Sequence, residues 1–505
     1  MIDGHGRTHN EIKVSRFDRG DLVRLIQNGS SSPVVPQVEY IARYCETLGA
    51  KTVVVEERYV DRHYLDEFAF FYSRNLVAPA SFVRRFHVFS GHFGKDDLAR
   101  RMAELLARRP DSDSPKGNIE NTYLGFICVR PLDTVPIGRT VLRRLKNREI
   151  WATGPYSVHL GNLLLEVDGL AFQQQDVAVG ACATAAAWSA LSRVTRHEHM
   201  RAPTPAEVSE SAARHLLSGG RVVPAGSGLT VQQLCEAVRS CGFAPEFVRA
   251  SERVEVFATT LHAYLLSGIP VILTLRRLDE GHDEGHAVTA VGFQRGKKPT
   301  PLLESSVGLR SAWMSKLYIH DDRIGPYARA FLRPIPATDR WKESLALEIE
   351  TNQEADPGSS EKWLVVGALT PVYPKIRLSV GSLLRLAEAM ADTMDRAVGP
   401  KFAPLLGVEF LFRRSGEYVR DLAGNVVNPG RAAQAFTALS LPRWCAITRW
   451  FVGETPIAEF VYDTTDVLRE SSQAETGLLL CVVCRHPVLD QVLAQIARKF
   501  QVLYV

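Results

Sequence analysis

The sequence predicts an α+β protein in which a central domain is flanked by two α/β domains, and three observations lead to this prediction. The chain has 505 residues, which is too long for one hydrophobic core and corresponds to roughly three domains of about 150 residues. Hydrophobic residues make up 46% and charged residues 23%, as in packed globular proteins. In the middle of the chain, amphipathic helical patterns are followed by β-branched apolar runs, so a helical half precedes an antiparallel β half.

An N-terminal α/β domain of unknown role is predicted over residues 1–168. Strand-like runs such as KTVVVEE and TYLGFICVRPL alternate there with helical patterns. From Lys95 to Arg108, for example, the leucines and the methionine recur on one helical face while the arginines lie on the other. This region contains no recognisable site.

The central domain is predicted over residues 169–345. One helix begins after the capping pair Thr204 and Glu207, and another runs from Leu229 to a stop at Gly242. The runs IPVILTLRR, AVTAVGF and KLYIHDD then read as buried strands. These three runs form the predicted β half.

A polar segment predicts where the central domain ends. ETNQEADPGSSEK is almost free of apolar residues and carries Pro, Gly and two Ser, which is typical of a linker. We therefore predict a linker over residues 346–362. A C-terminal α/β domain of unknown role follows over 363–505, with a strand in LVVGALTPVY and an amphipathic helix from Ser382 to Met394.

Charge and hydropathy exclude several classes of partner. The formal net charge is only +4, and no basic run is interleaved with aromatic residues, so we predict no nucleic-acid partner. The N-terminal residues are polar and lack the apolar stretch of a secretory signal. Apolar runs such as TGLLLCVVC are far shorter than the roughly 18 residues of a membrane span, so we expect no membrane partner and a cytoplasmic protein.

The eight cysteines are scattered, which predicts reduced and mostly buried thiols. Cys481 and Cys484 form a CVVC motif with His486 nearby, but a second pair of ligands is missing from the motif. We predict no metal site.

One thiol stands out because Cys182 opens an alanine-rich helical pattern. At a helix N-terminus, backbone N–H groups and the helix dipole favour the thiolate. His286, in GHAVTAVGF, is the predicted base, and His282 is the alternative nearby. Asp321, in LYIHDD, is the predicted partner that orients the histidine ring, and the adjacent Asp322 is the alternative, because neighbouring residues of a strand point to opposite faces and only one can meet the histidine. If Asp321 has this role, Asp322 is expected to make a surface ion pair or a turn bond.

In their order along the chain, these motifs resemble the papain-like cysteine peptidases, and most closely their bacterial C39-like branch. The similarity covers about residues 170–335. It implies that Cys182 is the nucleophile, His286 the general base and acid, and Asp321 the residue that orients His286. It further implies that the Gln175 amide joins the Cys182 N–H in an oxyanion hole. Gln173 and Gln174 are alternatives to Gln175, because three consecutive glutamines cannot be distinguished by position.

The predicted function is a hydrolase of the cysteine peptidase type, which cleaves a peptide or isopeptide bond through a thioester and needs no cofactor. A protein or peptide is the expected substrate, and the flanking domains are expected to present the substrate, gate the cleft or hold a partner protein. Two alternatives remain open. One is an acyltransferase or transglutaminase-like enzyme of the same fold, and the other is a non-catalytic scaffold that keeps the peptidase fold.

Overall fold

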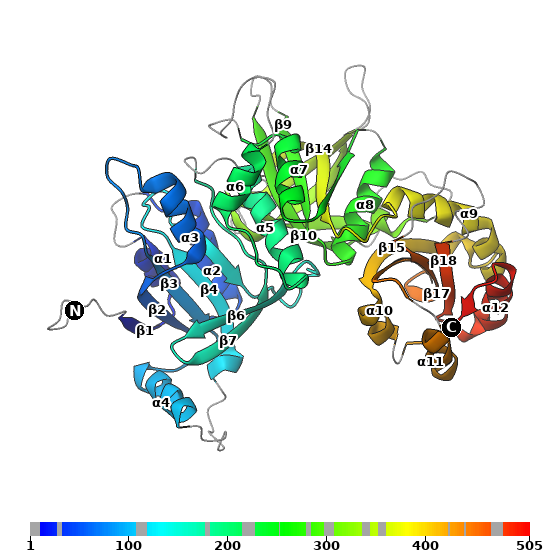
Figure 1. Ribbon diagram of the computed structural model, residues 1–505, viewed down its shortest axis with the longest axis horizontal. Coiled ribbons are helices and arrows are strands. Elements are labelled where there is room, and N and C mark those ends of the chain that lie inside the picture. The colour runs from blue at the N-terminus through cyan, green and yellow to red at the C-terminus, as the bar shows by residue number, and fades with distance from the viewer. Residues whose placement is uncertain are drawn as a thin grey trace.

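The computed structural model contains three units, each built on a β-sheet (Figure 1). All three contain both helices and strands, so the predicted combination of α and β structure is confirmed. The structure describes residues 11–27, 33–107, 119–176, 182–214, 228–251, 253–278, 284–296, 308–335, 344–351, 360–422, 425–438, 441–465 and 478–505.

The N-terminal unit contains an antiparallel sheet whose neighbouring strands are consecutive in the chain. In sheet order, its described strands are β1 (Ile12–Arg16), β2 (Thr52–Tyr59), β3 (Val83–Phe89), β4 (Tyr123–Val129) and β5 (Ile137–Leu142). Its helical segments are α1 (Arg19–Ile26), α2 (Pro36–Thr47), α3 (Arg62–Glu67), the π-helical turn η1 (Phe68–Tyr72) and α4 (Lys95–Leu106). A hairpin of β6 (Gly154–Leu160) and β7 (Leu163–Gly169) follows.

Both faces of this sheet are buried. Val53 and Val55 of β2 join a hydrophobic cluster with residues of α1 and α2, whereas Val54 joins the cluster that contains the β6–β7 hairpin. This division follows from the alternation of side chains along a strand. The second cluster continues into the central unit.

In the central unit most of the helices precede most of the strands, although one strand, β8 (Ala244–Arg249), comes before the last helix. Its described helices are α5 (Cys182–His197), α6 (Pro205–Ala213), α7 (Val231–Ser240) and α8 (Val254–Leu266). The Thr204 and Glu207 side chains form the expected capping box of α6, and Gly242 ends α7 with a φ of 82°. Its described strands are β8 (Ala244–Arg249), β9 (Val271–Arg277), β10 (Gly285–Arg295), β11 (Met314–Asp321), β12 (Gly325–Ile335), β13 (Ser344–Glu350) and β14 (Ser360–Val372).

Strand β14 closes the central sheet. The strand order is β13-β12-β11-β10-β9-β14-β8, and β14 also pairs with β13, so the two ends of a run of antiparallel strands meet. The predicted boundaries are therefore wrong at this point. The predicted linker, 346–362, contains most of β13, and the strand assigned to the C-terminal domain belongs to the central sheet; residues 352–359 lie outside the described part. The polar composition of this segment favours a domain boundary, but hydrogen bonds between strands make its two ends part of the central sheet.

The C-terminal unit has its own sheet and helices. In sheet order, the described strands are β15 (Leu406–Arg414), β16 (Trp444–Val452), β17 (Thr455–Asp463), β18 (Leu479–Cys484) and β19 (Leu503–Tyr504). The described helices are α9 (Val380–Val398), α10 (Ser415–Leu422), α11 (Pro429–Ala438) and α12 (Asp490–Lys499). The helix predicted from Ser382 to Met394 thus lies within α9.

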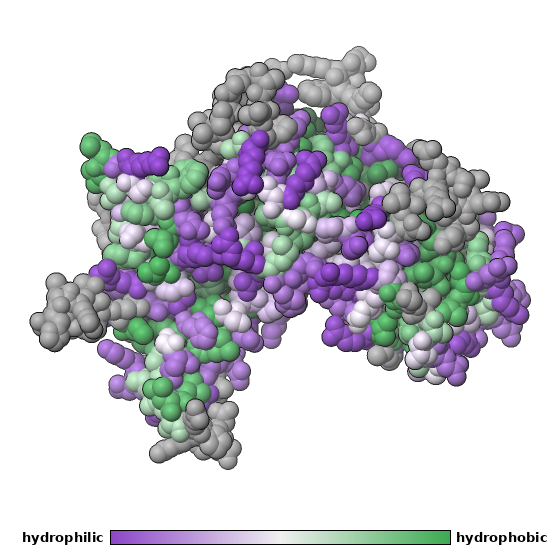
Figure 2. Space-filling view, in the orientation of Figure 1, coloured by the Kyte–Doolittle hydropathy of each residue, from purple (hydrophilic) through white to green (hydrophobic). Residues whose placement is uncertain are grey.

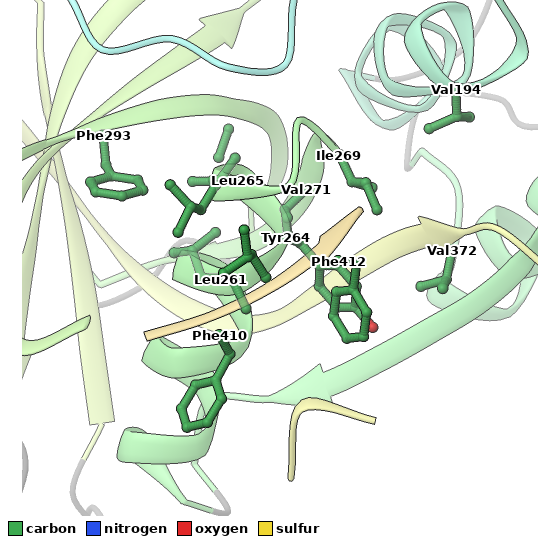
Figure 3. Packing of buried hydrophobic residues seen from close by; sticks show 14 of the residues in the cluster. Val194, Leu261, Tyr264, Leu265, Ile269, Val271, Phe293, Val372, Phe410 and Phe412 are labelled. Atoms are coloured by element: carbon green, nitrogen blue, oxygen red, sulfur yellow. The ribbon is translucent and has the colours of Figure 1, made fainter. Parts of the chain in front are cut away.

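Helix α8 joins the central and C-terminal units. It is apolar on almost all sides, as expected of a helix buried between two layers. Figure 3 shows Leu261 and Tyr264 of α8 beside Phe410 and Phe412 of β15, and the rings of Tyr264 and Phe412 are stacked with centroids 5.4 Å apart. The two units therefore share a hydrophobic core.

One face of the central unit is polar where α6 and α7 lie. Figure 2 shows hydrophilic side chains across the middle of the visible face, where α6 and α7 lie in Figure 1. This agrees with the amphipathic pattern of α7, whose buried residues recur on one side. Among the described residues, every helix is either too short or too polar to cross a membrane.

Candidate active site

Cys182 is the first residue of α5, the alanine-rich helix of the central unit. Only 9% of its surface is exposed. The small side chains of α5 allow β10 to approach closely, and Thr289 Oγ1 of β10 donates a hydrogen bond to the Ala186 carbonyl at 2.8 Å. This contact holds the strand that carries His286 against the helix that carries Cys182.

His286 lies between the thiol and a carboxylate. Its Nε2 is 3.1 Å from Asp321 Oδ1, and its side chain is also hydrogen-bonded to Cys182. Because Nε2 is directed at Asp321, Nδ1 is the nitrogen left for the thiol. Burial disfavours the imidazolium, but the charge of Asp321 and the bonds to Asp321 and Cys182 raise the pKa of His286 well above its ordinary value.

Asp321 is fixed at the end of β11. Besides its contact with His286, Asp321 Oδ1 accepts a hydrogen bond from the Arg323 backbone N–H at 2.9 Å. Burial alone would raise the pKa of Asp321, but the charge of His286 and the hydrogen bonds outweigh it and lower this pKa. The structure thus brings together the predicted nucleophile, base and orienting carboxylate.

Asp322 does not make the expected surface ion pair. It is buried, with 5% of its surface exposed, and atoms of His286, Asp321 and Asp322 lie within 4.8 Å of one another. The pairing of β11 with β12 is irregular between Ile319 and Asp321, so the simple alternation of faces ends before the two aspartates. Burial and the neighbouring Asp321 raise the pKa of Asp322 to about 7.

An imidazole and two carboxylates at this spacing form a donor set that metal ions can use. In this structure, however, Nε2 of His286 bonds directly to Asp321, which is the arrangement of an acid–base pair. The other motif considered for a metal, Cys481 and Cys484, lies buried in β18. Within the described residues, no further potential ligands gather beside those two thiols.

Trp363 covers the acid–base pair, and sequence reasoning missed it. Its ring centroid is 5.2 Å from that of His286, and only 1% of Trp363 is exposed. The Arg323 guanidinium lies over the same indole at 5.4 Å and forms an ion pair with Glu361 at 3.0 Å. An apolar cover of this kind keeps water away from a hydrogen bond between charged groups. No local signal could have identified Trp363, because only the pairing of β14 with β9 places it there.

The three glutamines before Cys182 have different surroundings. The Gln174 side chain accepts a hydrogen bond from the Ile137 N–H at 3.2 Å and donates to the Thr134 carbonyl at 3.4 Å. Gln173 donates from its amide to the carboxylate of Glu67. Among the described residues, Gln175 has no side-chain hydrogen bond, so its amide is the least engaged of the three. The oxyanion role of Gln175 remains a prediction, since residues 177–181 lie outside the described part.

The N-terminal unit supports this glutamine segment, which sequence reasoning did not anticipate. The Tyr72 hydroxyl donates a hydrogen bond to the carboxylate of Asp176. Glu67 is fully buried beside Arg130 at 3.5 Å, and burial raises its pKa to about 7. The segment that leads to the nucleophile is therefore anchored in a different unit of the protein.

His282, the alternative base, lies outside the described residues together with Asp283.

In comparisons with known proteins, no family model and no curated protein matched the chain. Chemically, a thiol at a helix N-terminus that contacts a carboxylate-bound imidazole can exist as a thiolate–imidazolium pair. Such a pair is suited to attack on an acyl carbon.

Proposed function

We propose that the protein is a papain-like cysteine peptidase that cleaves a peptide or isopeptide bond. One observation carries this proposal: the side chains of Cys182, His286 and Asp321 form a connected series of hydrogen bonds at the start of α5. The nucleophile comes from the helical half and the base from the β half. This division supports the papain-like assignment.

In the proposed reaction, the Cys182 thiolate attacks the carbonyl carbon of a protein or peptide substrate. The Cys182 N–H and the Gln175 amide stabilise the resulting oxyanion. The His286 imidazolium then donates its proton to the departing amine, which leaves a thioester on Cys182. His286 next removes a proton from water, and the resulting hydroxide hydrolyses the thioester to a carboxylic acid and restores the thiolate–imidazolium pair.

The raised pKa of His286 fits its roles in holding the Cys182 thiolate and in protonating the departing amine. At neutral pH the imidazolium is retained, so it can hold the thiolate and later protonate the amine. Asp321 remains ionised because its own pKa is lowered. The carboxylate therefore stabilises the imidazolium without competing for its proton.

The direct test is the rate at which iodoacetamide alkylates individual cysteines near pH 6.5. Cys235 and Cys241 are suitable internal comparisons, because both are partly exposed and burial raises the pKa of both thiols. We expect Cys182 to react at least about tenfold faster than either. If Cys182 reacts no faster than these two residues, the proposed nucleophile is wrong.

A second experiment tests the reaction class. A peptide library is incubated with the native protein and with a Cys182→Ala variant, and the products are identified by mass spectrometry. Hydrolysis by the native protein alone supports the peptidase. Products formed only when an amine acceptor is added would instead indicate acyl transfer, and a reactive Cys182 without any acyl product would favour the scaffold.

A further inference from the structure

A small cavity lies between α5 and strands β10 and β11, next to the candidate site. Its walls come from both halves of the central unit and from the glutamine segment, and they include Gln173, Ser189, Thr289, His320 and Asp322. The cavity has room for about one water molecule. It is therefore too small for a substrate.

Two residues that line this cavity each have a buried polar atom without a hydrogen-bond partner among the described residues. These atoms are Asp322 Oδ2 and His320 Nε2, whose residues are only 5% and 4% exposed. Buried polar atoms of this kind are normally satisfied by protein groups or by an ordered water molecule. Both atoms belong to residues that line the same cavity.

The hydrogen bonds of His320 define which of its nitrogens carries the proton. Ser189 Oγ donates its single proton to the Ala171 carbonyl oxygen at 2.7 Å. His320 Nδ1 lies 3.2 Å from Ser189 Oγ, which has no second proton to donate. Nδ1 must therefore be the donor in that contact, which leaves Nε2 as an acceptor. Burial lowers the pKa of His320 to about 3, so the ring is neutral.

A single water molecule in the cavity could donate a hydrogen bond to each of the two atoms. With two hydrogens, it can donate one bond to His320 Nε2 and the other to Asp322 Oδ2. Hydrogen bonds donated to a carboxylate favour its charged form. The water would thus hold Asp322 in place and support its ionisation.

Asp322 is also close to His286. Atoms of His286, Asp321 and Asp322 lie within 4.8 Å of one another, and the Gln37 side chain donates to the Asp322 backbone carbonyl at 3.0 Å. Besides Asp322, the charged or titratable groups that act most strongly on His286 and its carboxylates include Cys182, Asp321 and Arg323. Two carboxylates therefore act on one imidazolium.

We propose that Asp322 is a positioning residue, a second carboxylate that holds the imidazolium of His286 and is itself held by one buried water molecule shared with His320. This inference rests on the proposed function, because it concerns the same Cys182–His286 pair. The charge of Asp322 raises the pKa of His286, and Asp322 itself ionises near neutral pH. Its effect is therefore greatest on the alkaline side, where His286 would otherwise lose its proton.

The test is the pH dependence of Cys182 alkylation by iodoacetate from pH 4 to 10. The reagent is an anion that the imidazolium attracts, so the rate falls when His286 loses its proton. We expect an Asp322→Asn variant to show the alkaline fall about one pH unit lower than the native protein, with little change on the acid side. Glu361→Gln is the matched control, because Glu361 pairs with Arg323 and its loss should shift the alkaline fall by less than about 0.3 unit.

An alkaline fall within about 0.3 unit of the native value in Asp322→Asn, or an upward shift, would overturn the proposal. If that variant does not fold, His320→Phe tests the same idea, because it removes the second acceptor of the water molecule. A smaller downward shift is expected for His320→Phe, and an unchanged profile again overturns the proposal. If native Cys182 reacts no faster than Cys235 and Cys241 at any pH, the proposed function fails as well; a fast native reaction with no shift in the variants refutes only the role of Asp322.

Discussion

At the scale of single residues, the site combines groups that shift one another's protonation in opposite directions. The pKa of His286 is raised because Asp321 and Cys182 are hydrogen-bonded to it, so the imidazolium keeps its proton. The pKa of Asp321 is lowered by the charge and hydrogen bond of His286, so the carboxylate stays ionised. Asp322, whose Oδ2 has no hydrogen-bond partner among the described residues, has a pKa raised to about 7 by burial and by Asp321. Groups this close titrate as a unit.

Asp321→Asn is the sharpest change at this scale. The amide keeps the shape of the carboxylate but removes its charge, so the pKa of His286 should fall and the thiolate should be less populated. We expect peptide cleavage to fall by about 100-fold or more, as for other impaired acid–base groups. Steady-state kinetics would measure the loss. Asp133→Asn is the control, because Asp133 is an exposed aspartate of the N-terminal unit. Equal activity in both variants would exclude the assigned role of Asp321.

The His286–Asp321 pair should also make the stability of the folded protein depend on pH, and Asp321→Asn should remove this dependence. Because the folded-state pKa of His286 is raised, its stabilising contribution is complete below the ordinary value of about 6.5 and is lost as the pH rises through the raised pKa. Because that of Asp321 is lowered, its contribution is present above about 3.9 and is lost as the pH falls through the lowered pKa. The difference in apparent melting temperature between native protein and Asp321→Asn should therefore be largest from roughly pH 4 to 6.5 and narrow on either side.

At the scale of helices and strands, the predictions that succeeded rest on local patterns. The capping pair at Thr204 predicts the start of α6, and the apolar run after His286 predicts β10. Both elements lie near Cys182 in the central unit. Strand β14 closes the sheet by pairing with β13 and with β9, and β9 is distant in the sequence. A local sequence pattern cannot predict such long-range pairing. For this reason Trp363 was assigned to the wrong domain and its contact with His286 was not anticipated.

Strand β14 therefore carries a prediction of its own. Trp363→Ala opens the cover over the His286–Asp321 bond, so water can weaken it, and the loss of a buried indole should cost about 3–5 kcal/mol of stability. Trp363→Phe keeps an aromatic cover and should retain more of both properties. Thermal unfolding and iodoacetate profiles would measure the two effects. A Trp363→Ala variant with a native pH profile would show that the indole is not a cover for the pair.

At the scale of the whole molecule, both flanking units contribute to the central one. The buried Tyr327 hydroxyl donates to the Leu142 carbonyl at 3.0 Å and accepts from the Leu170 N–H at 2.9 Å, while the Tyr40 hydroxyl of α2 donates to the Pro326 carbonyl at 2.9 Å. On the other side, Tyr264 packs on Phe412 of β15. The proposed peptidase site lies in the middle of the chain, and these contacts make that part of the protein depend on its neighbours.

A fragment of residues 169–372 should therefore not fold as an independent peptidase, although it contains Cys182, His286 and Asp321. Cutting at these points exposes the apolar faces that normally pack on the N-terminal sheet and on β15, and such exposed surface costs more than a marginally stable domain can offset. We expect weak near-ultraviolet circular dichroism, binding of a hydrophobic dye and no preferential alkylation of Cys182. Tyr327→Phe in the full chain is the matched control, and it should lose only about 1–3 kcal/mol because the ring remains and two buried hydrogen bonds go. A fragment that unfolds cooperatively and alkylates Cys182 at the native rate would show instead that the central unit is autonomous, and that its flanks serve a separate purpose.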